Sequence, residues 1–183
     1  DPRNEYYRTY TVDFLQNVAG GPPVVYLNVP SSEMKGITQK LLEDGLPVWM
    51  GCDVGKQMHR QRGLWDANLF DFGALYGADF GMDKADRLRY GQTMMTHAML
   101  FTGVDVVDGK PRRWRVENSW GDKESGRKGY YTMNDSWYDE YMFEIACPPE
   151  YLSDEMKAGL DSEPIVLPAW DPMGSLARDE AFS

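Results

Sequence analysis

The apolar positions divide the first third of the chain into a strand, a helix and a second strand. Residues 24–29 are apolar and largely β-branched, which is typical of a strand. Ser31 then offers a helix N-cap, and the following apolar side chains recur at helical spacing as far as Gly45, a plausible C-cap. These side chains are Met34, Ile37, Leu41 and Leu42. Residues 47–54 form another apolar run, so we expect a strand that contains Cys52.

The clearest supersecondary pattern lies between residues 98 and 120. Residues 98–107 are apolar and β-branched, Asp108-Gly109 favours a tight turn, and residues 112–120 alternate between two kinds of side chain. One set is Trp114, Val116, Asn118 and Trp120, and the other is Arg113, Arg115, Glu117 and Ser119. The pattern predicts a β-hairpin with one solvated face.

The remaining segments predict short elements. Residues 63–90 are rich in Gly, Asp and aromatic side chains, and within this loop-rich region we expect short helices near 69–76 and 84–88. The apolar runs at residues 129–133 and 141–146 predict two further strands.

The end of the chain differs in character from the middle. Residues 153–160 suggest a short helix with a serine cap, and the chain from Pro164 is Pro-rich and extended. The fold class is therefore α+β, with an antiparallel or barrel-like sheet at its centre. We expect three segments: 1–45 as a connecting strand and helix, 46–163 as the main domain, and 164–183 as a C-terminal arm.

Composition excludes several classes of protein. A chain of 183 residues with 42% hydrophobic residues suits a packed domain, and its net charge of −10 argues against nucleic acid as a partner. No run of 18 apolar residues predicts a membrane span. Two cysteines, Cys52 and Cys147, are no disulfide framework, so we expect a reduced, cytoplasmic setting. The chain opens with Asp1 instead of Met, which suggests a sequence entered in the middle.

The hairpin brings an imidazole and a carboxamide together. If the turn has a two-residue loop, His97 faces Trp120 and Met99 faces Asn118, so His97 and Asn118 are diagonal neighbours about 7–8 Å apart at the backbone. A cysteine peptidase needs an imidazole that exchanges protons and an amide oxygen that holds it in one tautomer, here beneath a shielding indole. Taken alone, such a pair is more often structural than catalytic, so both interpretations stay open.

Several motifs resemble one family. The segment from Arg115 to Gly121 contains Asn-Ser-Trp-Gly, and Thr96-His97-Ala98 precedes it, as in papain-like cysteine peptidases. Further matching segments are Pro47 to Lys56, Met95 to Met99, and Leu167 to Gly174. Together they resemble the bleomycin hydrolase or aminopeptidase C family, from about Tyr7 to Ala177.

The resemblance implies a papain-like fold, of which this chain is the β-barrel-type half carrying His and Asn, followed by the C-terminal arm. His97 and Asn118 match the catalytic positions, and Thr96, Trp120 and Ala177 match substrate-binding positions. Members are cytoplasmic thiol aminopeptidases that act on peptide or amide substrates and assemble as homohexamers. For this chain we expect no cofactor and no metal. Their C-terminal carboxylate anchors the free amine of the substrate.

The sequence departs from the family at two places. It contains no Gly-Ser-Cys-Trp type motif and no upstream oxyanion glutamine, and both Cys52 and Cys147 are expected to be structural. We therefore expect a missing N-terminal half to carry the nucleophile, and the chain alone to be inactive. Six residues, Arg178 to Ser183, continue beyond Ala177, which puts the placement of the terminal carboxylate in question.

Other residues raise three further possibilities: a metal site, a nucleic-acid surface and a non-catalytic fragment. Cys52, Asp53 and His59 fit no zinc spacing, so no metal site is predicted. A basic cluster lies on the hairpin, but a solvated strand face explains it better than nucleic acid. Its members are Lys110, Arg112, Arg113 and Arg115. The alternative to an enzyme is a non-catalytic assembly or binding fragment.

Overall fold

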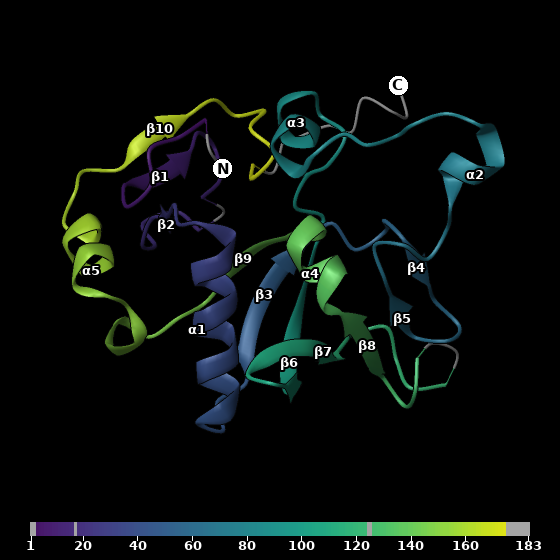
Figure 1. Cartoon of the computed structure of the whole chain (residues 1–183). Coiled ribbons are helices and arrows are strands. Elements are labelled where there is room, and N and C mark those ends of the chain that lie inside the picture. Colours follow the sequence, from purple (N-terminus) through teal and green to yellow (C-terminus); the bar gives the residue numbers. More distant parts are fainter. Residues whose placement is uncertain (1–2, 17, 124–125, 175–183) are drawn as a thin grey trace.

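Two β-sheets organise the computed structural model, which describes residues 3–16, 18–123 and 126–174. In this part of the chain a curled seven-stranded sheet has the order β4-β5-β8-β7-β6-β3-β9, and a smaller sheet has the order β10-β1-β2 (Figure 1). The strands are β1 Thr9–Val12, β2 Tyr26–Leu27, β3 Val48–Cys52, β4 Met58–His59, β5 Leu64–Trp65, β6 His97–Val107, β7 Lys110–Glu117, β8 Tyr130–Asn134, β9 Met142–Ile145 and β10 Ile165–Leu167. The helices are α1 Ser31–Glu43, α2 Phe72–Tyr76, α3 Lys84–Arg89, α4 Asp135–Tyr141 and α5 Asp154–Leu160, with a 3-10 turn at Pro149–Tyr151.

Helix α1 packs on the large sheet as its apolar spacing predicts, with Met34, Thr38 and Leu41 buried. The predicted N-cap is wrong, because Ser31 is the first helical residue and makes no capping hydrogen bond. The cap position belongs to Pro30, whose carbonyl accepts from two N–H groups of the first turn. The strand expected before the helix is also shorter than predicted and is reduced to β2.

The hairpin β6–β7 has the register of a two-residue loop. Asp108 and Gly109 both have positive φ, 51° and 74°, which is the type I′ geometry that matches the twist of the strands. Val107 pairs with Lys110 at the turn, and Leu100 pairs with Glu117 near the far end, while the register shifts by one residue and back between them. The two shifts compensate, so the facing pairs near His97 are those expected for the short loop.

The predicted alternation along β7 is confirmed, because Trp114, Val116 and Asn118 are buried, whereas the alternating positions are exposed, namely Arg113, Arg115 and Glu117. The core beneath this face is aromatic. The largest fully buried side chains include Trp65, Phe101, Trp114, Tyr131, Trp137 and Tyr138. Helix α4, which was not predicted from the sequence, supplies two of them and joins β8 directly to β9.

The two ends of the chain share the smaller sheet. Strand β1 pairs in parallel with β10, with Tyr10 opposite Ile165, and both lie to one side of α1 in Figure 1. The serine cap is confirmed, since Ser153 accepts from the N–H of Met156. Of the predicted extended tail, residues 165–167 are extended as β10, residues 169–174 form turns and bends, and residues 175–183 lie outside the described part of the chain. The three predicted segment boundaries remain predictions. None of the described helices is long and apolar enough to cross a membrane.

Candidate active site

His97 and Asn118 meet at one end of the large sheet. His97 is the first residue of β6, and Asn118 follows directly after β7, which pairs with β6. Nε2 of His97 lies 2.9 Å from Oδ1 of Asn118, and the asparagine is only 8% exposed. The structure therefore brings together the two residues that the sequence placed on one face of the hairpin.

The hydrogen bonds around Asn118 determine the tautomer of His97. The backbone N–H of Ser119 donates to Oδ1 of Asn118 at 2.8 Å, so the amide atom at this position must be the oxygen. An amide oxygen only accepts, and therefore Nε2 of His97 must carry the proton that it donates. Nδ1 is left as the ring nitrogen that can take up and release a proton.

Trp120 covers this pair. Its ring centroid lies 5.1 Å from that of His97, with an angle of 31° between the planes, and its edge meets Tyr131. The Nδ2 atom of Asn118 is buried and has no hydrogen-bond partner among the described residues. Because the indole limits access of water, the His97–Asn118 hydrogen bond lies in a medium of low dielectric constant, where polar contacts are stronger.

Thr96 fastens the start of β6 to the end of β3. Its N–H and its hydroxyl both donate to the carbonyl of Cys52, at 2.9 and 3.3 Å, and the hydroxyl accepts from the N–H of Val54 at 3.1 Å. These bonds fix the backbone next to His97. The role of Thr96 in substrate binding remains a prediction, and Ala177 lies outside the described residues.

Neither cysteine has surroundings that favour a thiolate. Cys52 pairs with His97 across the strands, but it is fully buried and its Sγ lies 3.7 Å from the backbone carbonyl of His97. Burial raises the pKa of the Cys52 thiol far above its ordinary value. Burial also raises the pKa of Cys147, with a smaller effect from Glu150. In the described part of the chain no three metal-ligating side chains lie together.

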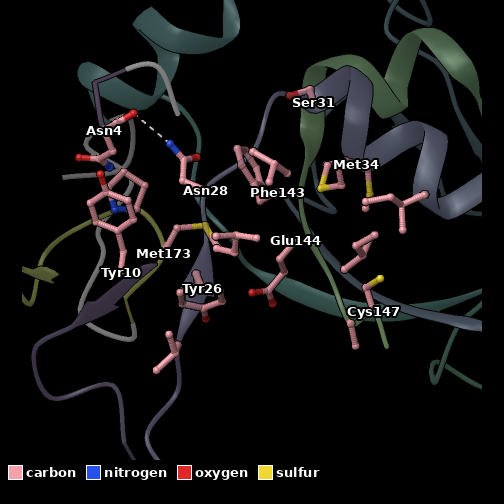
Figure 2. A pocket seen from close by; sticks show the side chains of 18 of the residues that line it. Asn4, Tyr10, Tyr26, Asn28, Ser31, Met34, Phe143, Glu144, Cys147 and Met173 are labelled. Atoms are coloured by element: carbon pink, nitrogen blue, oxygen red, sulfur yellow. Dashed lines mark hydrogen bonds between the residues drawn. The ribbon is translucent and has the colours of Figure 1, made fainter. Parts of the chain in front are cut away.

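A cavity of about 450 Å³ lies between the smaller sheet and β9 (Figure 2). Its walls are mainly apolar, but Glu144 and Lys84 also line it. Desolvation raises the pKa of Glu144, against the opposing effect of a hydrogen bond from Tyr26. Burial lowers the pKa of Lys84 to about 8, and its Nζ donates to the carbonyl of Met142 at 2.6 Å. Sequence reasoning missed both; the signal for Glu144 was a lone carboxylate inside an apolar strand run.

Residues 171–173 of the C-terminal arm connect this cavity with the segment before the histidine strand. The carbonyl of Pro172 accepts from the N–H of Met95, two residues before His97, at 3.0 Å. Met173 lines the cavity and lies near Tyr26 in Figure 2. The N–H of Met173 also donates to Oδ1 of Asp171 at 3.0 Å, which holds the turn of the arm.

A curled sheet that ends in a hydrogen-bonded His–Asn pair beneath an indole, with the asparagine buried, defines a papain-like peptidase fold. The chain belongs to the peptidase C1-like family, whose model matches residues 1–174. Bleomycin hydrolase of Homo sapiens is 45% identical over 181 residues, which is 97% of this chain and 40% of that protein. Aminopeptidase C of Streptococcus thermophilus is 46% identical over 173 residues, which is 94% of this chain and 39% of that protein.

A solved structure supports the same assignment. The crystal structure of PepW from Lactobacillus rhamnosis superimposes with a TM-score of 0.91 at 44% identity, covering 96% of this chain and 40% of that one. The chain therefore spans about 40% of the length of these relatives and corresponds to their C-terminal portion.

Proposed function

We propose that this chain is the His/Asn-bearing portion of a thiol aminopeptidase of the bleomycin hydrolase type. In this proposal the complete protein hydrolyses the N-terminal peptide or amide bond of its substrate by acyl transfer to a cysteine. The observation that carries the proposal is the 2.9 Å contact between Nε2 of His97 and Oδ1 of Asn118, which leaves Nδ1 free. The names of the relatives, bleomycin hydrolase and aminopeptidase C, support the substrate class.

The nucleophile in this proposal comes from residues outside the 183-residue chain. Cys52 is fully buried, and the pKa of both thiols is raised, whereas a nucleophilic cysteine needs a lowered pKa and access to substrate. The chain also contains no Gly-Ser-Cys-Trp segment. We therefore expect the chain by itself to be inactive.

His97 would act as base and then as acid. Nδ1 takes the thiol proton, the thiolate sulfur attacks the carbonyl carbon, and the imidazolium returns the proton to the leaving amine as the C–N bond breaks. A water molecule then gives its proton to Nδ1 while its oxygen displaces the sulfur and releases the acid. Asn118 holds the Nε2 proton throughout and keeps the ring in one orientation.

The finer points of the proposal follow the family. They are a cytoplasmic location, a homohexamer, and substrate contacts from Thr96, Trp120 and Ala177. A non-catalytic assembly or binding fragment is the second candidate, and the missing nucleophile motif is the observation that favours it.

The test is turnover of an unblocked aminoacyl-coumarin amide by the complete protein and by this chain alone. We expect alkylator-sensitive turnover by the complete protein, no turnover of the N-acetylated analogue, and loss of turnover in its His97→Ala variant. Retained acyl transfer in that variant would refute the assignment of His97. Alkylator-sensitive turnover by the chain alone would show that Cys52 or Cys147 is the nucleophile, and would refute the proposal that the nucleophile lies outside this chain.

A further inference from the structure

Trp120 contacts a cation as well as the histidine. The guanidinium carbon of Arg60 lies 5.0 Å from the Trp120 ring centroid, which in turn lies 5.1 Å from the His97 ring centroid. Arg60 follows β4 directly, and its carbonyl accepts from the N–H groups of Gly63 and Gly126, at 3.1 and 3.2 Å. Two backbone hydrogen bonds and one ring contact therefore hold an arginine next to the proposed general base.

The guanidinium of Arg60 is free to bind an anion. The residue is exposed, and no carboxylate of the described chain forms an ion pair with it. A guanidinium that packs on an aromatic ring keeps its N–H donors available at its edges, where they match the two oxygens of a carboxylate. Because the ring contact already restrains the side chain, less conformational entropy is lost on binding.

The sheet order indicates which part of a substrate would meet Arg60. Strands β3 and β9 lie on one side of the histidine strand β6, and strands β7, β8, β5 and β4 lie on the other. The first side is occupied by the chain itself, because Pro172 is bonded to Met95 and Met173 lines the cavity there (Figure 2). A substrate whose scissile bond lies at His97 would therefore extend its leaving part toward the other side of β6, where Trp120 and Arg60 lie.

We propose that Arg60, resting on Trp120, binds a carboxylate in the leaving part of the substrate. The leaving amine must lie next to Nδ1 of His97 to receive its proton, and each extended residue beyond it adds about 3.3–3.6 Å. A carboxylate on the first leaving residue thus comes within reach of the guanidinium. It is either an acidic side chain or the terminal carboxylate of a dipeptide. The inference rests on the proposed aminopeptidase function and adds a preference for acidic leaving groups.

The test compares matched substrates with the complete protein. Ala-Glu amide against Ala-Gln amide isolates the side-chain carboxylate, and Ala-Gln acid against Ala-Gln amide isolates the terminal one. We expect kcat/KM to favour the charged member of at least one pair by about 1.5-fold to fivefold, the range of an exposed charge pair. That ratio should fall to about one in Arg60→Gln and invert in Arg60→Glu.

Arg62→Gln is the matched control, because Arg62 is an exposed arginine two residues away with no ring contact in the described structure. Its substrate ratios should equal those of the unmodified protein, and a melting curve should confirm that all variants are folded. Equal ratios in the unmodified protein and Arg60→Gln would overturn the carboxylate subsite while the aminopeptidase function stands. Failure to hydrolyse any of the peptides would overturn the proposed function, and the subsite with it.

Discussion

The carboxamide oxygen of Asn118 lies 2.9 Å from Nε2 of His97, and the same oxygen accepts the N–H of Ser119. This double acceptance assigns the proton to Nε2 without reference to any mechanism. Asn118 follows β7 directly, and its side chain remains on the buried face of the hairpin. The orientation of the imidazole therefore depends on one buried amide.

Replacing Asn118 with Ala in the complete protein should lower kcat by about a hundredfold, because a misplaced ring no longer presents Nδ1 to the reacting atoms. KM should change much less, since Asn118 does not face solvent. Steady-state kinetics with an aminoacyl amide measures both. Asn68→Ala, an exposed asparagine, is the control. A variant that changes KM alone would show that Asn118 acts in binding and does not orient the histidine.

Two helical glycines should respond oppositely to alanine. A Cβ at Gly36 in α1 would meet nothing within 4 Å. Gly36→Ala should therefore raise the free energy of unfolding by about 0.5–1 kcal/mol, because alanine lowers the conformational entropy of the unfolded chain. A Cβ at Gly159 in α5 would collide with the backbone carbonyl of Tyr7, so Gly159→Ala should destabilise the protein by about 1–3 kcal/mol. Urea unfolding measures both values. Equal stabilisation by the two variants would contradict the close packing of α5 on the N-terminal segment.

Lys84 should make stability rise with pH in alkaline solution. Burial is the main cause that lowers its pKa from 10.5 to about 8; Glu140 and Asp139 oppose the shift, and Arg87 and Lys35 add to it. Between pH 8 and 10.5 the folded state has released this proton and the unfolded state keeps it, so unfolding takes up a proton. The free energy of unfolding should then rise by at most about 1.4 kcal/mol per pH unit.

The measurement is the difference in unfolding free energy between the protein and its Lys84→Met variant, followed across that pH range. The difference removes the titration of the tyrosines, which both proteins share. Lys157→Met, at an exposed position in α5, is the control: its unfolding free energy should rise with pH as steeply as that of the unmodified protein. A difference that is flat or falls with pH would mean that the Lys84 amine stays solvated.

Local patterns predicted β2, β3, β6, β7, β8 and β9 and the helices other than α4, but not the short strands β1, β4 and β5. The segments around Cys52, Met133 and Ile145 were recognised as strands because apolar runs of this length need a sheet to bury them. Helix α4 was missed although Trp137, Tyr138 and Tyr141 have helical spacing, because the helix has only seven residues and lies directly between two strands; it buries Trp137 and Tyr138 in the shared core. The cap at Ser31 was wrong because Pro30 occupies that position.

The sequence by itself determined the hairpin and, with it, the meeting of His97 and Asn118. The turn dipeptide and the period-two alternation are local, and a slip of one residue would expose Trp114 and Val116 to water. Only the tertiary structure decided that Arg60 rests on Trp120 and that Pro172 bonds to Met95. These contacts join segments that are far apart in the chain. They form only when the packed core holds the loops and the arm in place, so no local sequence pattern predicts them.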